Sequence, residues 1–296
     1  MEDKVARTGL FSIFLGGVIL AAGCSDSGDD YDDIDERNAE IVENLIEAGF
    51  SEEDIDVREA SVFGEELTLI ESEMQVFVDG DMHVTLEASR EMLDQGAESF
   101  RHWRTPNLIN NKNGTVCLVK ITTAQGAYSS YALTNNMKTG INRARTNFNN
   151  VSGLPLPFKV GQGKVNGNGQ FSHTISGCTY SIYFYKVSGG AGGSAGFPSG
   201  GKPYNQVRLN SGLAGHTLNV FEHVATHEIG HAIGLRHTDW KTRASCGQNT
   251  NEGKSGAVQI SGTANQTTNS LMASCFSSGS NGEFQGEDEE ALGKLY

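Results

Sequence analysis

Residues 227–237 read H-E-I-G-H-A-I-G-L-R-H, and the fold of this 296-residue chain is built around them. His227 and His231 are four residues apart, so a helix places both imidazoles on one face. Gly234 can adopt the positive φ that ends a helix and reverses the chain, which brings His237 up as a third ligand. Three histidines leave the fourth position of a zinc ion open for water, and Glu228 lies beside it as a general base. The stretch predicts a catalytic zinc site.

The residues before this motif continue a helical pattern. Thr217 stands where a helix N-cap would, and apolar residues at helical spacing follow it, which predicts a helix of about five turns. Gly230 costs such a helix about 1 kcal/mol relative to alanine, so we expect another backbone to pack closely against it. His223 lies one turn before His227 on the same face. Its ordinary interpretation is a hydrogen-bonded or partly exposed helix histidine, and the alternative is a further site residue.

These residues resemble the metzincin clan, in which a tight turn downstream of the motif carries a methionine beneath the metal. Residues 270–274 read S-L-M-A-S and supply Met272 for that role. The wording of the motif, continued by T-D, is similar to the bacterial HEIGH metallopeptidase family. The segments F-R-H-W-R-T-P-N-L at 100–108 and D-E-E-A-L-G-K-L-Y at 288–296 are similar to that family as well. The resemblance covers residues 100–296.

The resemblance implies an α+β, zincin-like catalytic domain at residues 101–296, with a twisted mixed sheet, an active-site helix and a Met-turn. It also implies a zinc endopeptidase in which Zn²⁺ is held by His227, His231 and His237, and Glu228 activates the zinc-bound water. One departure is that astacin-like and serralysin-like members place a tyrosine two residues after the turn methionine, where this chain has Ser274. The role of that tyrosine in stabilising the transition state is therefore not carried over.

The N-terminus is typical of a targeting segment. Lys4 and Arg7 precede an uncharged stretch at 9–22 that is too short to span a bilayer as a helix. It ends in L-A-A-G-C, which resembles a bacterial lipoprotein signal-peptidase site with Cys24 as the lipidated residue; a secretory signal without lipid is the alternative. Residues 1–23 are thus expected to be a signal peptide, and residues 24–35 an acidic tether. We expect an outer-membrane or cell-surface lipoprotein, or else a periplasmic or secreted protein.

Once Cys24 is set aside, four cysteines are left, an even number that fits an oxidising compartment and allows three pairings. Cys117 and Cys178 both fall in strand-like runs. Cys246 and Cys275 follow the zinc motif and the methionine turn, two segments that a metzincin fold brings together. We therefore expect the disulfides Cys117–Cys178 and Cys246–Cys275. None of these cysteines belongs to a C-x-x-C pair, so they do not predict a second metal site.

Charge divides the chain into two halves. Residues 26–100 hold 25 acidic residues and three arginines, a net charge of −22, whereas residues 101–296 hold 17 basic and 9 acidic residues, a net charge of +8. Opposite charges favour docking of the acidic segment on the catalytic domain. Two interpretations of residues 36–100 stay open. One is a prosegment that covers the cleft, with a carboxylate such as Asp79 or Asp81 on the zinc, and the other is a small accessory domain that never enters the site.

Within residues 101–296 the pattern predicts strands and helices in alternation. Residues 131–149 have helical spacing, and residues 158–160 and 181–187 read as strands. Residues 188–201 contain seven glycines and are expected to be a surface loop, or alternatively a mobile rim of the cleft. Residues 205–210 are expected to be an edge strand that pairs with the substrate backbone. Residues 287–296 read as a closing helix.

The function predicted for this chain is zinc-dependent peptide-bond hydrolysis, with protein or peptide substrates. The alternatives are a surface binding or scaffold lipoprotein with a silent zincin fold, and a zinc amidase acting on cell-wall peptide. The membrane is an expected partner through the lipid anchor, whereas nucleic acid is not. Asp239 follows the motif, either as a residue that orients a ligand imidazole or as a plain loop residue.

Overall fold

The computed structural model describes residues 35–63, 67–93, 103–249, 258–263 and 269–296. The expected signal peptide, the lipidation site Cys24 and nearly all of the expected tether lie outside the described residues. Ile34–Tyr296 form one compact unit. In the part of the chain that the structure describes, no helix combines the length and the apolar character needed to cross a membrane.

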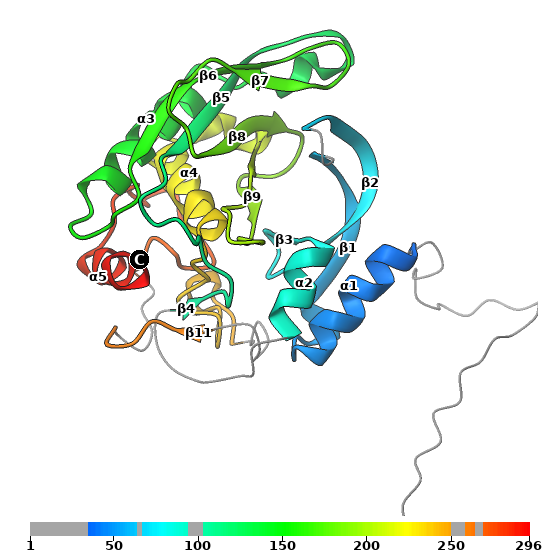
Figure 1. Ribbon diagram of the computed structural model, residues 1–296. Helices are drawn as coiled ribbons and strands as arrows, with labels where there is room; N and C mark the ends of the chain where they lie inside the picture. Colours follow the sequence, from blue (N-terminus) through cyan, green and yellow to red (C-terminus); the bar gives the residue numbers. More distant parts are fainter. Residues whose placement is uncertain (1–34, 64–66, 94–102, 250–257, 264–268) are drawn as a thin grey trace, which may run out of the picture. The chain divides into compact units, whose positions relative to one another are not determined.

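A nine-stranded mixed sheet, in the order β1-β2-β3-β9-β10-β8-β5-β6-β7, runs through this unit (Figure 1). The strands of this sheet are β1 (Ile55–Phe63), β2 (Leu69–Val78), β3 (Met82–Val84), β5 (Val116–Ala124), β6 (Phe158–Val165), β7 (Phe171–His173), β8 (Tyr180–Val187), β9 (Gly193–Gly196) and β10 (Gln206–Asn210). Strands β6, β5, β8 and β10 are parallel to one another, and β9 is antiparallel to β10. The short strands β4 (Trp103–Arg104) and β11 (Val258–Gln259) pair separately.

The helices of the described residues are α1 (Glu36–Glu47), α2 (Leu86–Leu93), α3 (Asn135–Asn150), α4 (Leu218–Ala232) and α5 (Gly286–Leu295). Side-chain caps begin several of them: the Asp35 carboxylate accepts from the Asn38 amide (2.8 Å), the Thr85 hydroxyl from the Ala88 amide (3.2 Å) and the Thr134 hydroxyl from the Met137 amide (3.4 Å). The predicted helix at residues 131–149 thus begins at residue 135, and 3₁₀ structure occupies residues 126–131.

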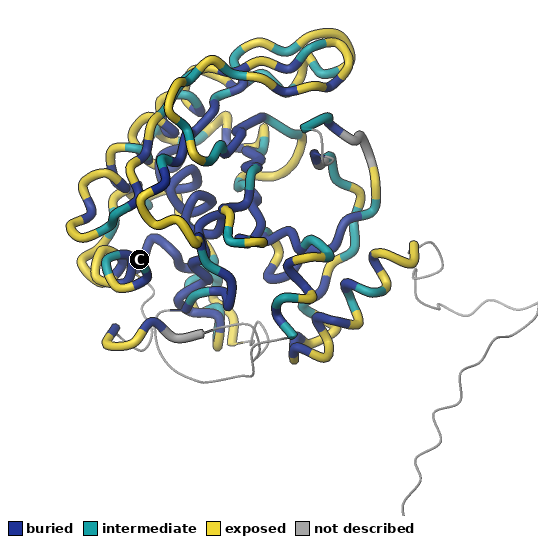
Figure 2. Tube along the Cα trace, in the orientation of Figure 1, coloured by how far each residue is buried: buried dark blue, intermediate teal, exposed yellow. Residues whose placement is uncertain are grey.

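Helix α4 lies at the centre of the molecule and is buried along most of its length (Figure 2). It packs closely on α3 at Gly140, where an added Cβ would lie 2.7 Å from the carbonyl carbon and oxygen of Phe221. Apolar side chains of the two helices and of β5, β8 and β10 form one core, which includes Leu118, Phe148 and Leu209. A helix buried on this scale is held by its surroundings more than by its own propensity.

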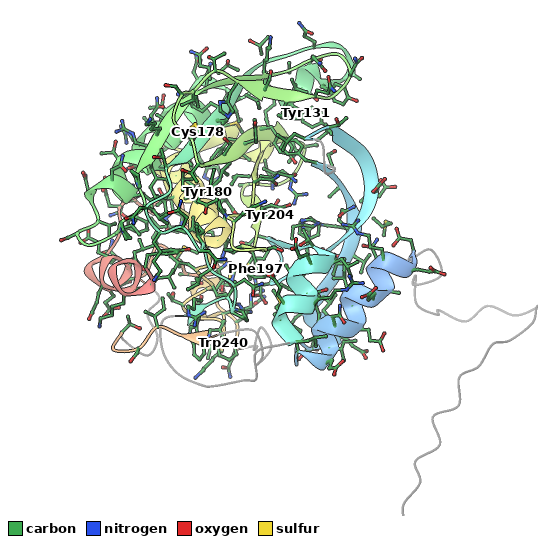
Figure 3. The ribbon with its side chains drawn as sticks, in the orientation of Figure 1. Tyr131, Cys178, Tyr180, Phe197, Tyr204 and Trp240 are labelled. Carbon is green, nitrogen blue, oxygen red and sulfur yellow. A yellow bond between two sulfur atoms is a disulfide. The ribbon has the colours of Figure 1, made fainter. Side chains whose placement is uncertain are left out.

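The N-terminal elements form a second apolar cluster of their own. Residues of α1, α2 and β1–β3 pack together, among them Leu45, Val76 and Met82, and Phe197 joins them from the segment after β9. Strand β3 is fixed through His83, whose Nδ1 lies 2.6 Å from the Tyr204 hydroxyl and whose Nε2 lies 3.0 Å from Gln75 Oε1. Figure 3 labels Tyr204 and Phe197 near this junction.

Two of the expectations for the glycine-rich region are wrong. Residues 188–201 are not a loop throughout, because Gly193–Gly196 form β9. The expected edge strand at residues 205–210 is interior, since β10 lies between β8 and β9. Strand β9 in turn pairs on its outer side with β3 in parallel register, Met82 opposite Ala195 and His83 opposite Gly196.

Candidate active site

Two of the motif histidines, His227 and His231, lie one turn apart on α4, as the spacing predicts. Each ring is oriented by a backbone carbonyl. His227 Nδ1 donates to the Leu271 carbonyl (2.9 Å), and His231 Nδ1 donates to the Leu235 carbonyl (2.8 Å). A neutral imidazole that donates from Nδ1 has a lone pair on Nε2, so both rings offer Nε2 as a ligand atom.

The third histidine arrives through the turn after the helix. Gly234 has a φ of +110°, a conformation that side chains rarely adopt, and its amide donates to the His231 carbonyl (2.9 Å). An added Cβ at Gly234 would also lie 2.9 Å from the Leu108 side chain. The Thr105 amide holds the turn from outside by donating to the Gly234 carbonyl (2.8 Å). The reversal places His237 against the helix.

The three Nε2 atoms converge. Those of His227 and His231 are 2.9 Å apart, and each is 3.2 Å from that of His237. Three lone pairs that point at one centre suit a cation there. Ligand atoms at about 2.05 Å from a tetrahedral zinc ion lie about 3.3 Å from each other, close to the separations here. The donor set therefore fits a zinc ion.

A fourth potential ligand comes from the N-terminal half. Asp81 Oδ2 lies 3.4 Å from His237 Nε2 and 3.6 Å from His227 Nε2, and the four ligand atoms of Asp81 and the histidines all lie within 4.8 Å of one another. Burial raises the pKa of Asp81, but the facing imidazoles outweigh it and hold that pKa well below its usual range. Asp79, the other acid considered from the sequence, pairs instead with Arg236 at 2.6 Å.

Glu228 lies beside the histidines with its carboxylate available. Its residue is 2% exposed, and Oε2 has no hydrogen-bond partner among the described residues. Burial, reinforced by the charge of Asp81, raises the pKa of Glu228 well above its usual range. Gly193 of β9 makes room for it, because an added Cβ there would lie 2.8 Å from Glu228 Oε1. A cavity of about 500 Å³ is lined by Glu228, His227 and Asp81.

Met272 packs directly against the helix that carries the ligands. A Cβ added at Gly230 would lie 2.5 Å from Met272 Sδ and 3.0 Å from its Cε. The glycine was expected to face another backbone, and that expectation is wrong, because its neighbour is a buried side chain. Met272 itself is 1% exposed.

The turn that contains Met272 is held by Asp288 of α5, a residue that the sequence did not single out. Asp288 Oδ2 accepts from the Leu271 amide (3.0 Å), while the Leu271 carbonyl accepts from His227. Ser270 donates its hydroxyl proton to Asp288 and accepts from the Met272 amide (2.9 Å). Asp288 is 1% exposed and is linked to the His227 ring through the backbone of Leu271. It is the first residue of the 288–296 segment that resembles the family, and it lies in the first turn of α5, where it completes a capping box with Gln285.

Asp239 organises the loops around the site. Its Oδ1 accepts from the amide and the hydroxyl of Ser274 (both 2.8 Å), and its Oδ2 accepts from the Ser245 amide (2.8 Å). Burial raises the pKa of Asp239, but these hydrogen bonds outweigh it and lower that pKa. The disulfide Cys246–Cys275 joins the same two loops. The second disulfide, Cys117–Cys178, joins β5 to the segment before β8.

His223 is a buried, hydrogen-bonded helix residue, the ordinary interpretation of its position. Its Nδ1 donates to the Asn281 carbonyl (2.9 Å), and its ring stacks at 6.2 Å from that of His227. Burial, and then the charge of His227, lowers the pKa of His223 to about 4. It therefore stays neutral near pH 7.

Comparisons with known proteins place this site in a family. The model of the dual-action HEIGH metallopeptidases matches residues 76–296, a span that includes Asp81 as well as the three histidines. Two solved structures of myroilysin are similar at TM-scores of 0.36. The first is 14% identical, and the match covers 62% of this chain and 80% of the myroilysin chain. The second is 12% identical, and the match covers 63% of this chain and 86% of the myroilysin chain. No curated protein matches. The chain belongs to the HEIGH metallopeptidase family and is a metallopeptidase.

Proposed function

We propose that this metallopeptidase is a zinc-dependent endopeptidase whose general base is Glu228. The observation that carries the proposal is the convergence of three imidazole nitrogens beside a buried carboxylate, that of Glu228, whose Oε2 has no partner among the described residues. His227 and Glu228 line the same cavity. A site kept only to hold a metal needs the ligands but has no use for that carboxylate. This argues against a silent scaffold.

The chain's own residues divide the chemistry between them. His227, His231 and His237 would hold a zinc ion, which supplies a Lewis acid for the scissile carbonyl and for the attacking water. Glu228 accepts the proton of that water and passes it to the leaving amine. Its raised pKa supports this role, because a carboxyl that binds its proton more tightly is the stronger base.

We further propose a metzincin-like catalytic domain at residues 101–296, with Met272 as the methionine of its Met-turn. The support is that Met272 packs under the ligand-bearing helix at Gly230, while the adjacent Leu271 carbonyl orients His227. Strand β9 lies beside Glu228 and would become the edge of the sheet if β3 left it. Its backbone would then be free to pair with an extended substrate.

Residues 36–100, the covering segment, are proposed to be a prosegment that keeps the enzyme latent. Three contacts support this. Asp81 faces the three Nε2 atoms, β3 pairs along β9, and Asp79 forms a buried ion pair with Arg236 inside the motif. Together they occupy the side from which a peptide would approach the histidines. A small accessory domain that never enters the site would not need a carboxylate at this position.

Attachment to the outer membrane through a lipid on Cys24 is a proposal that rests on the sequence around that residue. Labelling cells with a palmitate analogue tests it. The wild-type protein should carry the label and Cys24→Ala should not. A wild-type protein that is secreted without label would favour the plain secretory signal.

The experiment for the proposed function compares protein and cell-wall substrates. The purified protein is incubated with an unfolded protein and, separately, with peptidoglycan fragments, with and without a zinc chelator. We expect chelator-sensitive cleavage within the unfolded protein. Cleavage confined to the peptidoglycan peptides would identify an amidase instead. Stoichiometric zinc without cleavage of either substrate, also after Asp81→Ala, would favour the scaffold.

A further inference from the structure

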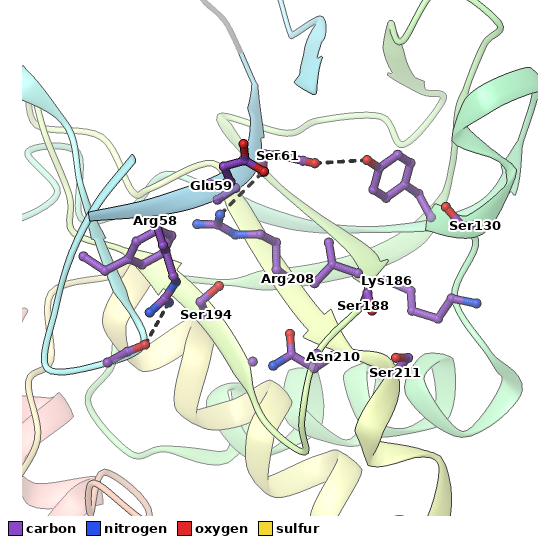
Figure 4. A pocket seen from close by; sticks show the side chains of 17 residues that line it. Arg58, Glu59, Ser61, Ser130, Lys186, Ser188, Ser194, Arg208, Asn210 and Ser211 are labelled. Carbon is purple, nitrogen blue, oxygen red and sulfur yellow. Dashed lines mark hydrogen bonds between the residues drawn. The ribbon is translucent and has the colours of Figure 1, made fainter. Parts of the chain in front are cut away.

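A second cavity, of about 830 Å³, lies between the β1–β2 hairpin and the ends of β8, β9 and β10 (Figure 4). Its lining is polar and rich in cations and hydroxyls. Arg58, Lys186 and Arg208 face it together with Ser61 and Ser194, and Glu59 is the one carboxylate among the residues that line it. The proposed catalytic chemistry uses none of these side chains.

Arg208 is the unusual member of this group. It is 3% exposed, yet its guanidinium has a single hydrogen bond among the described residues, from Nη1 to the Ser61 carbonyl at 3.4 Å. Nε and Nη2 are buried and have no partner in the described part of the chain. The guanidinium lies 4.9 Å from the centre of the Phe77 ring. An arginine keeps its charge at every physiological pH, and the charge of Arg208 lowers the pKa of Glu228, although no carboxylate among the described residues hydrogen-bonds the guanidinium.

Arg58, a second cation of the cavity, does not share this property. Arg58 is 38% exposed in its side chain, forms an ion pair with Asp56 and donates to the Gly80 carbonyl. Its charge is therefore already compensated. The two donors of Arg208, Nε and Nη2, lie on one edge of the planar guanidinium. A carboxylate can accept a hydrogen bond from each of them, one with each oxygen.

The cavity adjoins the proposed catalytic centre. Gly80, Gly193 and Asn210 line both this cavity and the one that contains Glu228 and His227. Arg208 also stands opposite Ser194 in the β10–β9 register, so their side chains share a face of the sheet. A peptide strand beside β9 would present alternate side chains to that face.

We propose that Arg208 and the hydroxyls around it form a carboxylate-binding site, which takes the side chain of an aspartate or glutamate, or the C-terminal carboxylate, of a peptide. As a substrate subsite this assignment rests on the proposed function. The binding of a carboxylate itself does not, because the cavity is present in the full chain with the covering segment in place. The two parts can therefore be tested apart.

The binding test uses small probes on the full chain carrying Glu228→Gln, followed by calorimetry. N-acetyl-aspartate amide is compared with N-acetyl-asparagine amide, and N-acetyl-glycine with N-acetyl-glycinamide. We expect at least one of the acids to bind tenfold or more tightly than its amide, and the better acid of the two identifies the source of the carboxylate. Equal affinity of acids and amides would overturn the site, and so would tighter binding of inorganic phosphate than of either acid.

Variants in the same background assign the binding to Arg208. Arg208→Gln should weaken the preferred acid at least tenfold, and Arg208→Lys, which keeps the charge without the fork, should weaken it less. Arg58→Gln is the matched control, since its cation is already paired, and should change the affinity less than threefold. Melting curves verify that each variant is folded. Unchanged affinity in both Arg208 variants would contradict the assignment.

The subsite is tested with quenched peptides in which aspartate or asparagine occupies successive positions around one cleavable bond. In the activated Asp81→Ala protein, kcat/KM should be tenfold or more higher for aspartate than for asparagine at one position, and adding Arg208→Gln should remove that preference while the asparagine peptide is still cleaved. Cleavage without any preference would overturn the subsite. Carboxylate binding without cleavage of any peptide would instead count against the proposed endopeptidase and leave the carboxylate site standing.

Discussion

Asp79 and Arg236 form an ion pair in which both side chains are fully shielded from solvent, with Oδ2 and Nη2 2.6 Å apart. Arg236 directly precedes the ligand His237, and Asp79 stands two residues before Asp81. The turn from Asp79 to Asp81 contains two residues with a positive φ, Asp79 at +58° and Gly80 at +88°. One ion pair thus ties the zinc motif to the turn that directs Asp81 at the histidines.

Loss of Asp81 should activate the enzyme. Asp81→Ala removes the carboxylate that competes with substrate and water at the histidines, so cleavage of a quenched peptide by the full chain should rise tenfold or more at equal zinc content. Asp56→Ala, an acid of the same segment paired with Arg58 near the surface, is the control and should leave the rate unchanged. Intact-mass spectra exclude proteolytic removal of the segment as the cause. A rate unchanged or lowered by Asp81→Ala would contradict the latency proposal.

Replacing one partner of the Asp79–Arg236 pair should destabilise the folded protein more than replacing both partners together. Asp79→Asn or Arg236→Gln removes one partner of a fully buried ion pair, which should lower the free energy of unfolding by about 3–5 kcal/mol. The double variant leaves no charge behind, so its loss should be smaller than the sum of the two single losses. Urea unfolding of the four proteins measures the coupling. Strictly additive losses would show that the two side chains do not stabilise each other.

Gly230→Ala should destabilise the protein although alanine favours helices. The gain in helix propensity is about 1 kcal/mol, whereas forcing a Cβ to 2.5 Å from the buried Met272 Sδ is overpacking that costs about 1–3 kcal/mol. In a Met272→Ala background the space is free, and the same substitution should become neutral or stabilising. Thermal unfolding measures the effect of Gly230→Ala on stability in the wild-type background and in the Met272→Ala background. An equal cost in both backgrounds would mean that Met272 is not the obstacle.

The sequence predicts the parts of the site that are local. The spacing of His227 and His231 and the glycine at 234 determine a helix and its turn within eleven residues, and the geometry of that segment is the one that the spacing requires. The fourth potential ligand, Asp81, lies far away in sequence. The sequence names Asp79 and Asp81 as carboxylates that could face the zinc, and it has no pattern that chooses between them. Only the packing of β3 on β9 selects Asp81.

Strand β9 could not be predicted for a physical reason. A strand is recognised by alternating side chains, and two of its four residues are glycines. Gly193 makes room for Glu228, while a Cβ at Gly196 would lie 2.7 Å from the His83 carbonyl and 2.9 Å from the Tyr204 ring. The close packing of this strand therefore requires glycines, and these glycines remove the alternation of side chains by which a strand is recognised. Without β9, the sequence pattern predicts β10 as the edge of the sheet.

Acid should destabilise the folded protein through His223. Its pKa is about 4 when folded, against about 6.5 when unfolded, so the unfolded chain binds the proton first as the pH falls. The stability contributed by the neutral ring is complete above pH 6.5 and is lost between pH 6.5 and 4, by up to about 3 kcal/mol. His223→Gln lacks this titration, so its stability relative to wild type should improve as the pH drops from 7 to 5. A constant difference would contradict the assignment.

The central claim is that Glu228 is the base of a zinc peptidase, and Glu228→Gln tests it most directly. Glutamine keeps the size of the side chain and cannot accept the proton. The activated Asp81→Ala protein and its Glu228→Gln derivative are compared in zinc content, in melting temperature and in cleavage of one quenched peptide. We predict equal zinc, equal or higher melting temperature and at least a thousandfold loss of kcat. Cleavage within tenfold of the parent at equal zinc content would contradict the role of Glu228.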